Sequence, residues 1–353
     1  MIAVVADDIS GAAELAGAAL RHGLRAEVQT SFDPATDADV VCLDTDTRSL
    51  AASEAAPRTA EAVRRLAEAR PRWIYKKCDS VLRGNVRAEL LAAMGAAGKS
   101  RAMLVSANPS RRRVVRAGQI FVGDLPLHDT PFAHDPEHPR TTARIVDLLG
   151  GEIGGVDAPD AESAADLVRH AEAVDGGILP AGGVEFFEAL LRKEGCKAGG
   201  PVAAGPRPSY AVTLAVCGSA TSWAVRRDQA GALGMTVFAF PLEASAIAAE
   251  LRVKGRALVG IGDGPVTRSF APTALVSRLA RVCAEVLALV PTDRVLLEGG
   301  ATAGAVIHRL AWKRLAACQV AAPGVGALRP VGEERPLVLI KPGSYDWPAE
   351  IWG

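Results

Sequence analysis

The sequence predicts an α/β protein of two domains, each a mostly parallel sheet flanked by helices. Short apolar runs alternate with longer stretches of helical periodicity along the whole chain, and this alternation is typical of parallel sheets. The 353 residues are enough for about two domains. A stretch rich in glycine, proline and alanine at residues 193–208 indicates a linker. We place the boundary near Gly205, which gives domains of residues 1–205 and 206–353.

The composition is that of an ordinary globular protein, with 49% hydrophobic and 23% charged residues and no formal net charge. A neutral chain has no overall electrostatic attraction to nucleic acid or to an anionic membrane. The six cysteines lie far apart, as expected of free thiols in a reducing compartment. The start lacks a signal-peptide pattern, and no apolar run is long enough to span a membrane. We expect a cytoplasmic protein. The sequence is compatible with a homo-oligomer.

The first domain is predicted to open with a buried strand at residues 2–6 and a helix at residues 12–21. Further strands are predicted at residues 25–29, 40–43, 73–77, 102–105 and 177–180. Further helices are predicted at residues 52–69, 86–94, 161–173 and 184–193. The helices separate the strands, so the strands are expected to run parallel.

Acidic residues follow three of these strands. Asp7 and Asp8 follow the first, Asp44 and Asp46 follow the third, and Asp79 follows the run at residues 73–77. Because the carboxyl ends of parallel strands meet at one edge of a sheet, the three acidic ends should lie on the same edge. Open α/β sheets bind their ligands there, which predicts a site.

The stretch from Trp73 to Asn85 is the most informative part of this edge. Asp79 and Arg83 are four residues apart and would share a face of a helical turn. A carboxylate beside a guanidinium suits a small ligand that carries hydroxyls and a carboxylate. The alternative is a surface ion pair at the start of a helix.

Two further segments of the first domain carry charge. Residues 108–113 form a basic loop that suits a local anion, although a solvated surface run would look the same. Residues 125–139 contain three histidines, but their spacing matches no standard metal site. We interpret this second segment as a lid or covering loop.

The second domain repeats the α/β pattern, with glycines and hydroxyls after its strands instead of acids. Strands are predicted at residues 211–216, 236–240, 257–261, 295–297 and 337–340, and helices at residues 221–233, 242–251, 273–289 and 301–310. The turns at Gly218-Ser219, at Gly299-Gly300 and at Lys341-Pro342-Gly343 are candidate phosphate sites, because glycine lets backbone amides approach an anion. Each is a weak signal alone, and the dinucleotide and P-loop signatures are absent from the sequence.

Together the two halves favour phosphoryl transfer. One domain would hold a polar acceptor and the other a nucleotide, with the active site in the interdomain cleft and closure excluding water. The reaction needs a carboxylate to orient or deprotonate the acceptor hydroxyl. It also needs cations, usually including Mg²⁺, to neutralise the transferred group.

Seven motifs in this order resemble the four-carbon acid sugar kinase family, which includes the 3-oxo-tetronate, threonate and erythronate kinases. They are ADDISGAAELAG (residues 6–17), DTDTR (44–48), YKKCDSVLRGN (75–85), NPSRRRVVRAG (108–118), CGSATSWAVRRDQ (217–229), EGGATAGAV (298–306) and IKPGSY (340–345). YKKCDSVLRGN is the most specific. The resemblance covers essentially the whole chain and implies a sugar-acid-binding domain followed by an ATP-binding domain.

The resemblance also implies roles for particular residues. The substrate positions are Asp8, Arg48, Asp79, Ser80, Arg83 and Arg113. The positions at the ATP site are Ser219, Gly299, Gly300, Ala301, Thr302 and Gly343. Asp79 is our candidate for the acceptor base, with Asp8 near the same hydroxyls. ATP and Mg²⁺ are the implied cofactors, and no residue is assigned to the metal.

The chain departs from the family pattern where an acid normally follows the glycine pair, because Ala301 stands there. Glu298 precedes the glycines and is a candidate substitute. The departure favours a second hypothesis, a sugar-acid-binding or regulatory protein with weakened or lost ATP turnover. A third hypothesis takes Asp7 and Asp8 as a phosphatase-like nucleophile pair, although they lack the usual acid-x-acid spacing.

Overall fold

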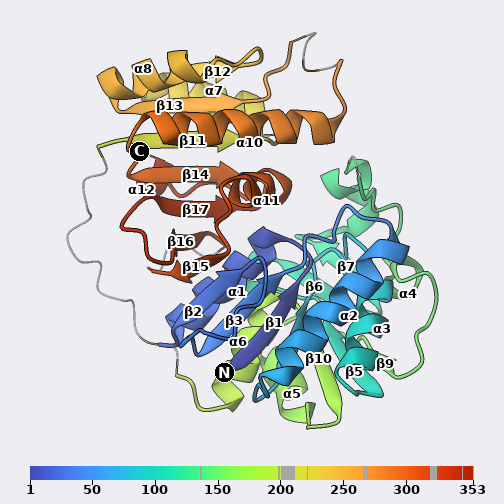
Figure 1. Ribbon diagram of the computed structural model, residues 1–353. Coiled ribbons are helices and arrows are strands. Elements are labelled where there is room, and N and C mark those ends of the chain that lie inside the picture. The colour runs from blue at the N-terminus through green and yellow to red at the C-terminus, as the bar shows by residue number, and fades with distance from the viewer. Residues whose placement is uncertain are drawn as a thin grey trace. The chain divides into compact units, whose positions relative to one another are not determined.

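The computed structural model describes residues 1–135, 137–197, 199, 211–220, 222–264, 267, 269–318, 324–343 and 345–352. The chain divides into two compact units, Met1–Gly200 and Pro201–Gly353, which are described separately below (Figure 1). The boundary predicted near Gly205 lies outside the described residues, as do Thr221 and Ser344 of the predicted motifs.

The main sheet of the first unit is parallel throughout, in the order β2-β3-β1-β4-β10-β5-β9. Its strands are β1 (Ile2–Ala6), β2 (Ala26–Gln29), β3 (Val40–Asp44), β4 (Ile74–Lys77), β5 (Arg101–Val105), β9 (Val156–Asp157) and β10 (Ile178–Gly182). Every residue of β1 is buried, as its apolar run predicted. The predicted parallel sheet is confirmed.

Helices cover both faces of this sheet (Figure 1). They are α1 (Ile9–Arg21), α2 (Ala52–Glu68), α3 (Val86–Ala96), α5 (Ala164–Ala173) and α6 (Val184–Lys193), with the short α4 (Ile145–Leu148). Helix α6 packs against α1 and α5, whereas α2 packs against α3. The chain moves along the sheet in opposite directions through α1 and α2, so right-handed crossovers place these two helices on opposite faces.

A small antiparallel sheet in the first unit was not predicted. Strands β6 (Arg113–Arg116), β7 (Gln119–Val122) and β8 (Leu125–Pro126) form it in that order. Single-turn helices η1 (Pro109–Arg111), η2 (Leu127–Asp129) and η3 (Pro131–His134) flank it. The prediction of loops here was therefore partly wrong, because strands this short give almost no periodic signal.

The second unit has the order β12-β13-β11-β14-β17-β16-β15, in which β16 is antiparallel to both of its neighbours and the other pairs are parallel. The strands are β11 (Thr213–Cys217), β12 (Thr236–Ala239), β13 (Arg256–Gly260), β14 (Arg294–Glu298), β15 (Arg314–Ala317), β16 (Gly326–Pro330) and β17 (Leu337–Lys341). Five of them match predicted strands, while β15 and β16 were missed.

The helices of the second unit are α7 (Trp223–Ala232), α8 (Ala244–Lys254), α10 (Pro272–Leu289), α11 (Gly300–Arg309) and α12 (Ala349–Trp352). Helices α8 and α11 both pack against α10, and α7 contacts β12 and β13. This is again a mostly parallel sheet flanked by helices.

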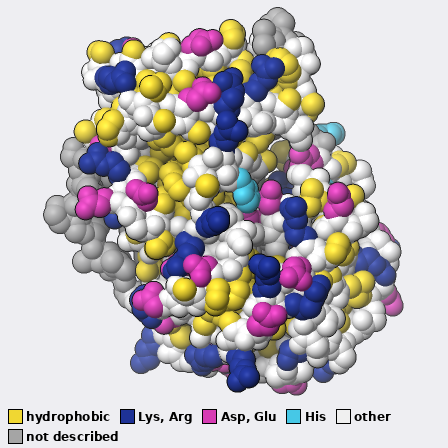
Figure 2. Space-filling view, in the orientation of Figure 1, with side chains coloured by type: hydrophobic (Ala, Val, Ile, Leu, Met, Phe, Trp, Pro, Cys, Tyr) yellow, Lys and Arg dark blue, Asp and Glu magenta, His cyan; other side chains and the backbone are white. Residues whose placement is uncertain are grey.

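The face shown in Figure 2 has no field of a single sign. Figure 2 shows basic and acidic side chains intermixed over the visible face, in keeping with the zero net charge. In the part of the chain that the structure describes, no helix is both long and apolar enough to cross a membrane.

Candidate active site

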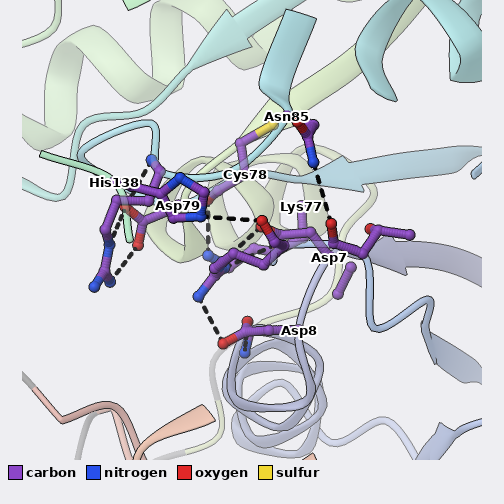
Figure 3. Close-up of polar contacts among 12 residues, drawn as sticks. Asp7, Asp8, Lys77, Cys78, Asp79, Asn85 and His138 are labelled. Carbon is purple, nitrogen blue, oxygen red and sulfur yellow. Dashed lines mark hydrogen bonds and ion pairs between the residues drawn. The ribbon is translucent and has the colours of Figure 1, made fainter. Parts of the chain in front are cut away.

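The three acidic strand ends of the first unit are neighbours. Strand β1 lies between β3 and β4 in parallel register. Asp44 ends β3, Asp7 and Asp8 follow β1, and Asp79 lies two residues beyond β4. Figure 3 shows Asp7, Asp8 and Asp79 gathered with their contacts at this edge. The sheet order therefore places the predicted acids together.

Asp8 begins α1 as its N-cap. Its Oδ1 accepts a hydrogen bond from the backbone N–H of Gly11 at 2.8 Å, and its Oδ2 accepts one from the Ser10 hydroxyl at 2.5 Å. A Cβ on Gly11 would lie 2.9 Å from Asp8 Oδ1 and 3.3 Å from the Lys77 side chain. Residue 11 must therefore be glycine for Asp8 and Lys77 to keep these positions.

Arg48 holds both acids that follow β1. Its Nε and Nη2 bind the two carboxylate oxygens of Asp7 at 2.7 and 2.8 Å, and its Nη1 binds Asp8 Oδ2 at 2.6 Å. Burial raises the pKa of Asp7, but Arg48, Lys76 and Lys77 outweigh it, so the pKa lies below its ordinary value. Asp7 is therefore ionised at neutral pH.

Asp79 and Arg83 meet as predicted, but through a tight turn rather than a helix. Arg83 Nε lies 3.0 Å from Asp79 Oδ2, and Nη2 lies 2.9 Å from Oδ1. Leu82, at φ 56°, closes the turn with a hydrogen bond from its N–H to the Asp79 carbonyl. Burial raises the pKa of Asp79, but the Arg83 guanidinium holds it well below its ordinary value.

Ser80 and Arg113 meet in the same region. Arg113 comes from β6, and its Nη1 donates to Ser80 Oγ at 2.6 Å with both residues buried. Two other arginines of the predicted basic segment behave differently, because Arg112 and Arg116 form exposed ion pairs with acids on the surface. The anion-binding interpretation therefore applies to Arg113 and not to these two.

A segment that we call the covering segment, residues 130–135 and 137–140, packs on these groups. The ring of Phe132 lies 5.6 Å from the Arg83 guanidinium and 5.3 Å from that of Arg113. Asp135 Oδ2 forms an ion pair with Arg83 Nη1 at 3.2 Å. The predicted covering role agrees with these contacts.

The covering segment also contacts the turns that carry the site. The ring of His138 lies within hydrogen-bond distance of the Arg48 carbonyl, with Nε2 at 3.0 Å (Figure 3). Arg140 Nη1 donates to the Leu82 carbonyl at 2.8 Å. No group of histidines, cysteines and acids suited to a metal ion occurs within the described ranges.

Two buried lysines complete this edge, and sequence reasoning did not assign them to the site. Lys76 Nζ pairs with Glu89 at 2.8 Å, and Lys77 Nζ lies 3.5 Å from Glu14. The adjacent lysines after an apolar strand were a visible signal, but only the fold supplies their acidic partners. Because each lysine has its own acid, the strand can carry both into the interior.

The charge of Asp44, the acid that ends β3, is disfavoured by its surroundings. Its Oδ2 is buried and has no hydrogen-bond partner among the described residues, while Oδ1 accepts from the Asp46 N–H at 3.0 Å. Burial, followed by repulsion from Asp46, Asp8 and Asp7, raises its pKa well above the ordinary value. The protonated form of Asp44 is therefore favoured, whereas the charged forms of Asp7 and Asp79 are favoured.

The predicted nucleotide positions converge within the second unit. Ser219, Gly299 and Gly343 follow β11, β14 and β17, which are adjacent parallel strands. A Cβ on Gly218 would lie 1.8 Å from Thr302 Oγ1, and a Cβ on Gly343 would lie 3.3 Å from Ser219 Oγ. The turns are thus packed so closely that glycine is required at position 218.

These turns suit a phosphate. Gly299 adopts φ 99° and is the N-cap of α11, where no side chain accepts from the first N–H groups. The start of α7 likewise has no side-chain cap. Uncapped helix starts carry partial positive charge and free N–H donors, which bind anions. The residues present therefore fit a triphosphate.

Glu298 does not supply the missing acid. Its carboxylate is buried and engaged by Arg226, Lys341 and Trp347 at 2.8, 2.8 and 2.9 Å. Ala301 itself is exposed at the start of α11. The hypothesis that Glu298 substitutes for an acid at position 301 is therefore not supported by its surroundings.

Comparison with known proteins gives a family match over half the chain. Residues 2–179 match the model of a sugar-binding N-terminal domain. A D-threonate kinase from Salmonella typhimurium is 35% identical over 149 residues, and this match spans 41% of the chain but only 35% of that kinase. A 3-oxo-tetronate kinase from Methylobacterium radiotolerans is 28% identical, over 97% of the chain and 95% of the relative.

A solved structure is also similar. It is a domain of unknown function (DUF1537) from Bordetella bronchiseptica, a domain-swapped dimer with bound citrate. It is 28% identical with a TM-score of 0.51, and the match covers 98% of this chain and 95% of that one.

Proposed function

The chain belongs to the four-carbon acid sugar kinase family, and we propose that it is an ATP-dependent kinase for a four-carbon or similar sugar acid, or its 3-oxo form. The phosphate would go to the terminal hydroxyl. In this proposal the first unit binds the sugar acid and the second unit binds ATP. We also propose a homo-oligomer, because the similar structure is a domain-swapped dimer.

One observation carries the proposal. A single edge of the first unit brings together acids and buried or partly buried arginines, with Asp79 paired to Arg83 and Arg113 bonded to Ser80. Such a set can accept hydrogen bonds from hydroxyls and donate them to a carboxylate. The citrate in the similar structure is itself a hydroxy carboxylate, which supports this ligand class.

We assign roles on that basis. Arg83 and Arg113, which both contact Phe132, bind the substrate carboxylate together with the positive charge of Arg48. Asp79 and Asp8 accept hydrogen bonds from the acceptor hydroxyl. A carboxylate with a low pKa is a weak base, but phosphoryl transfer passes through a loose transition state, in which orienting the hydroxyl matters more than deprotonating it early.

In the transfer step the acceptor oxygen bonds to the γ-phosphorus, while the bond from that phosphorus to the β–γ bridging oxygen breaks. The hydroxyl proton passes to Asp79 or Asp8, and ADP leaves. N–H groups at Gly300, Ala301 and Thr302, with Ser219 and Gly343, hold the phosphates, and Gly299 shapes the turn that presents them. Mg²⁺, proposed to arrive on the triphosphate, neutralises charge when bound. Contact between the two substrates requires the predicted cleft, which stays part of the proposal.

The test is ADP release by the purified protein with Mg-ATP and a panel of D- and L-threonate, D-erythronate and the 3-oxo-tetronates. We expect turnover with at least one of them and a product that carries one phosphate on its terminal oxygen, as seen by ³¹P NMR. No ADP release above the ATP-only rate with any member would contradict the proposal.

The exposed Ala301 favours one alternative, a sugar-acid-binding or regulatory protein of the same fold. Thermal shifts separate the two functions. A kinase should be stabilised by a sugar acid and also by Mg-ATP, because each ligand binds the folded state. Stabilisation by a sugar acid alone, without any shift in Mg-ATP, would favour the binding protein.

A further inference from the structure

Glu298 is the centre of a buried charge cluster in the second unit. Its Oε2 accepts hydrogen bonds from Arg226 Nε at 2.8 Å and from Trp347 Nε1 at 2.9 Å. Its Oε1 lies 2.8 Å from Lys341 Nζ. The side chains of Glu298, Lys341 and Arg226 are only 1%, 0% and 2% exposed. Three side chains therefore contact one buried carboxylate.

The partners come from the elements that carry the proposed phosphate turns. Glu298 is the last residue of β14, directly before Gly299, and Lys341 is the last residue of β17, two residues before Gly343. The two are register partners across the strands, and the Gly299 N–H donates to the Lys341 carbonyl at 2.9 Å. The ion pair thus fixes the ends of both strands relative to each other.

Arg226 connects the cluster to the third turn, the one at Ser219. It lies in the first turn of α7, the helix that follows Ser219 and Ser222. Ser222 Oγ donates to the Gly343 carbonyl at 3.0 Å and accepts from Ser219 Oγ at 3.1 Å. Hydrogen bonds through Ser222 therefore connect the Ser219 turn to Gly343. Arg226 connects helix α7, which follows this turn, to Glu298.

The C-terminal segment closes the cluster. Trp347 binds Glu298 through its indole N–H, and its ring lies 5.4 Å from Lys341 Nζ and stacks on Trp352 at 6.4 Å. Both tryptophans belong to the apolar core of the unit. Packing on this core holds the indole N–H in place for Glu298.

The cluster contains both positive and negative side chains. Arg226 and Lys341 carry two positive charges against the one negative charge of Glu298, and Asp346, which also pairs with Arg226, is 92% exposed. Burying ions without a purpose is costly, and apolar residues of similar volume often stabilise as well. Because its members end two strands and begin the helix next to the proposed phosphate turns, this buried cluster suits a role in positioning those turns.

We infer that Glu298 is a positioning residue of the nucleotide site, and that its carboxylate sets the spacing of the Ser219, Gly299 and Gly343 turns. The inference rests on the proposed function of this unit. Glu298 itself touches no phosphate in this account. It acts through the three turns, so its loss should weaken nucleotide binding and leave sugar-acid binding unchanged.

The test compares Glu298→Gln and Lys341→Met with matched surface variants of the same unit, Glu285→Gln and Lys254→Met. The controls change the same chemical groups, but at surface ion pairs in which the replaced side chains, Glu285 and Lys254, are 44% and 53% exposed. Lys341→Met leaves the Glu298–Arg226 pair intact and balanced in charge, so it keeps the test valid if Glu298→Gln fails to fold. Calorimetric titration measures the Kd for Mg-ATP and for the best sugar acid, below the Tm of each variant.

We expect the Kd for Mg-ATP to rise about tenfold or more in both cluster variants and less than about twofold in the controls. The Kd for the sugar acid should stay unchanged in all four. A purely structural role would lower the Tm without this selective loss, and unchanged Mg-ATP binding in a folded cluster variant would overturn the inference. If the wild type binds no nucleotide, the proposed function fails, and the inference fails with it.

Discussion

Arg83 and Asp79 form a two-point ion pair, with Arg83 Nε 3.0 Å from one carboxylate oxygen and Nη2 2.9 Å from the other. The same guanidinium contacts Asp135 and the ring of Phe132. Its orientation is therefore fixed before any ligand arrives. A pre-oriented cation loses less conformational entropy on binding, which favours recognition of a small carboxylate.

Replacing Asp79 tests the proposed acceptor site. Asp79→Asn keeps the shape but removes the charge that would orient the acceptor hydroxyl, so we expect kcat to fall by about 10²–10⁴-fold. Steady-state ADP release measures it. The control is Asp37→Asn, because Asp37 is 86% exposed in a surface ion pair of the same unit. An Asp79→Asn enzyme with wild-type kcat would remove Asp79 from the reaction.

Asp44 gives a prediction about pH. Its folded pKa is raised above the ordinary 3.8, so its contribution to stability is full below pH 3.8 and is lost as the pH rises towards the folded pKa. Asp44→Asn places a neutral group there at every pH. We expect the variant to have a higher Tm than the wild type at pH 7, with the difference shrinking as the pH falls and vanishing by about pH 4. A variant less stable than the wild type at pH 7 would contradict the burial argument.

Replacing Phe132 tests whether the covering segment contributes to sugar-acid binding. Its ring contacts Arg83 and Arg113, and cation–π contacts are worth about 0.5–2 kcal/mol each. Phe132→Leu should therefore weaken sugar-acid binding by about fivefold or more, measured by calorimetric titration. The matched control is Phe121→Leu, which removes a similar ring from Arg116, an arginine in an exposed ion pair. Equal effects of the two substitutions would rule out a specific role for Phe132.

Replacing Ala301 tests whether the lack of the acid in the family pattern limits turnover. Ala301→Asp places a carboxylate in the first turn of α11, where the helix dipole favours negative charge, so we expect no loss of stability. If the missing acid limits turnover, kcat with Mg-ATP should rise by about tenfold. Thermal melts and ADP release check both parts. A lower kcat would mean that the chain positions the nucleotide without an acid here.

Much of the fold could be predicted because its strands are buried on both faces. Runs such as residues 2–6 are apolar throughout, and the apolar run at residues 337–340 is followed by Lys341, the last residue of the strand. Strands β6 to β8, β15 and β16 were missed, because they are short and antiparallel with little alternation. The turn at Leu82 was missed too, since a leucine at positive φ has no sequence signal.

The candidate site was predictable where residues follow strands, and not where partners come from far along the chain. Asp8, Asp79 and Arg83 lie beside strand ends, so topology alone places them. The contacts of Phe132, Asp135 and His138 with the arginines depend on how residues 130–140 fold back, and periodicity does not encode that path. The engagement of Glu298 by Arg226 and Trp347 was hidden for the same reason.

The most direct test of the central claim is a crystal structure of the protein with a tetronate and a non-hydrolysable ATP analogue. The account predicts the sugar-acid carboxylate on Arg83 or Arg113 and its terminal hydroxyl within hydrogen-bond distance of Asp79 or Asp8. It also predicts the phosphates on the N–H groups that follow Gly299. A tetronate bound elsewhere, with Asp79, Arg83 and Phe132 still in their present contacts, would contradict it.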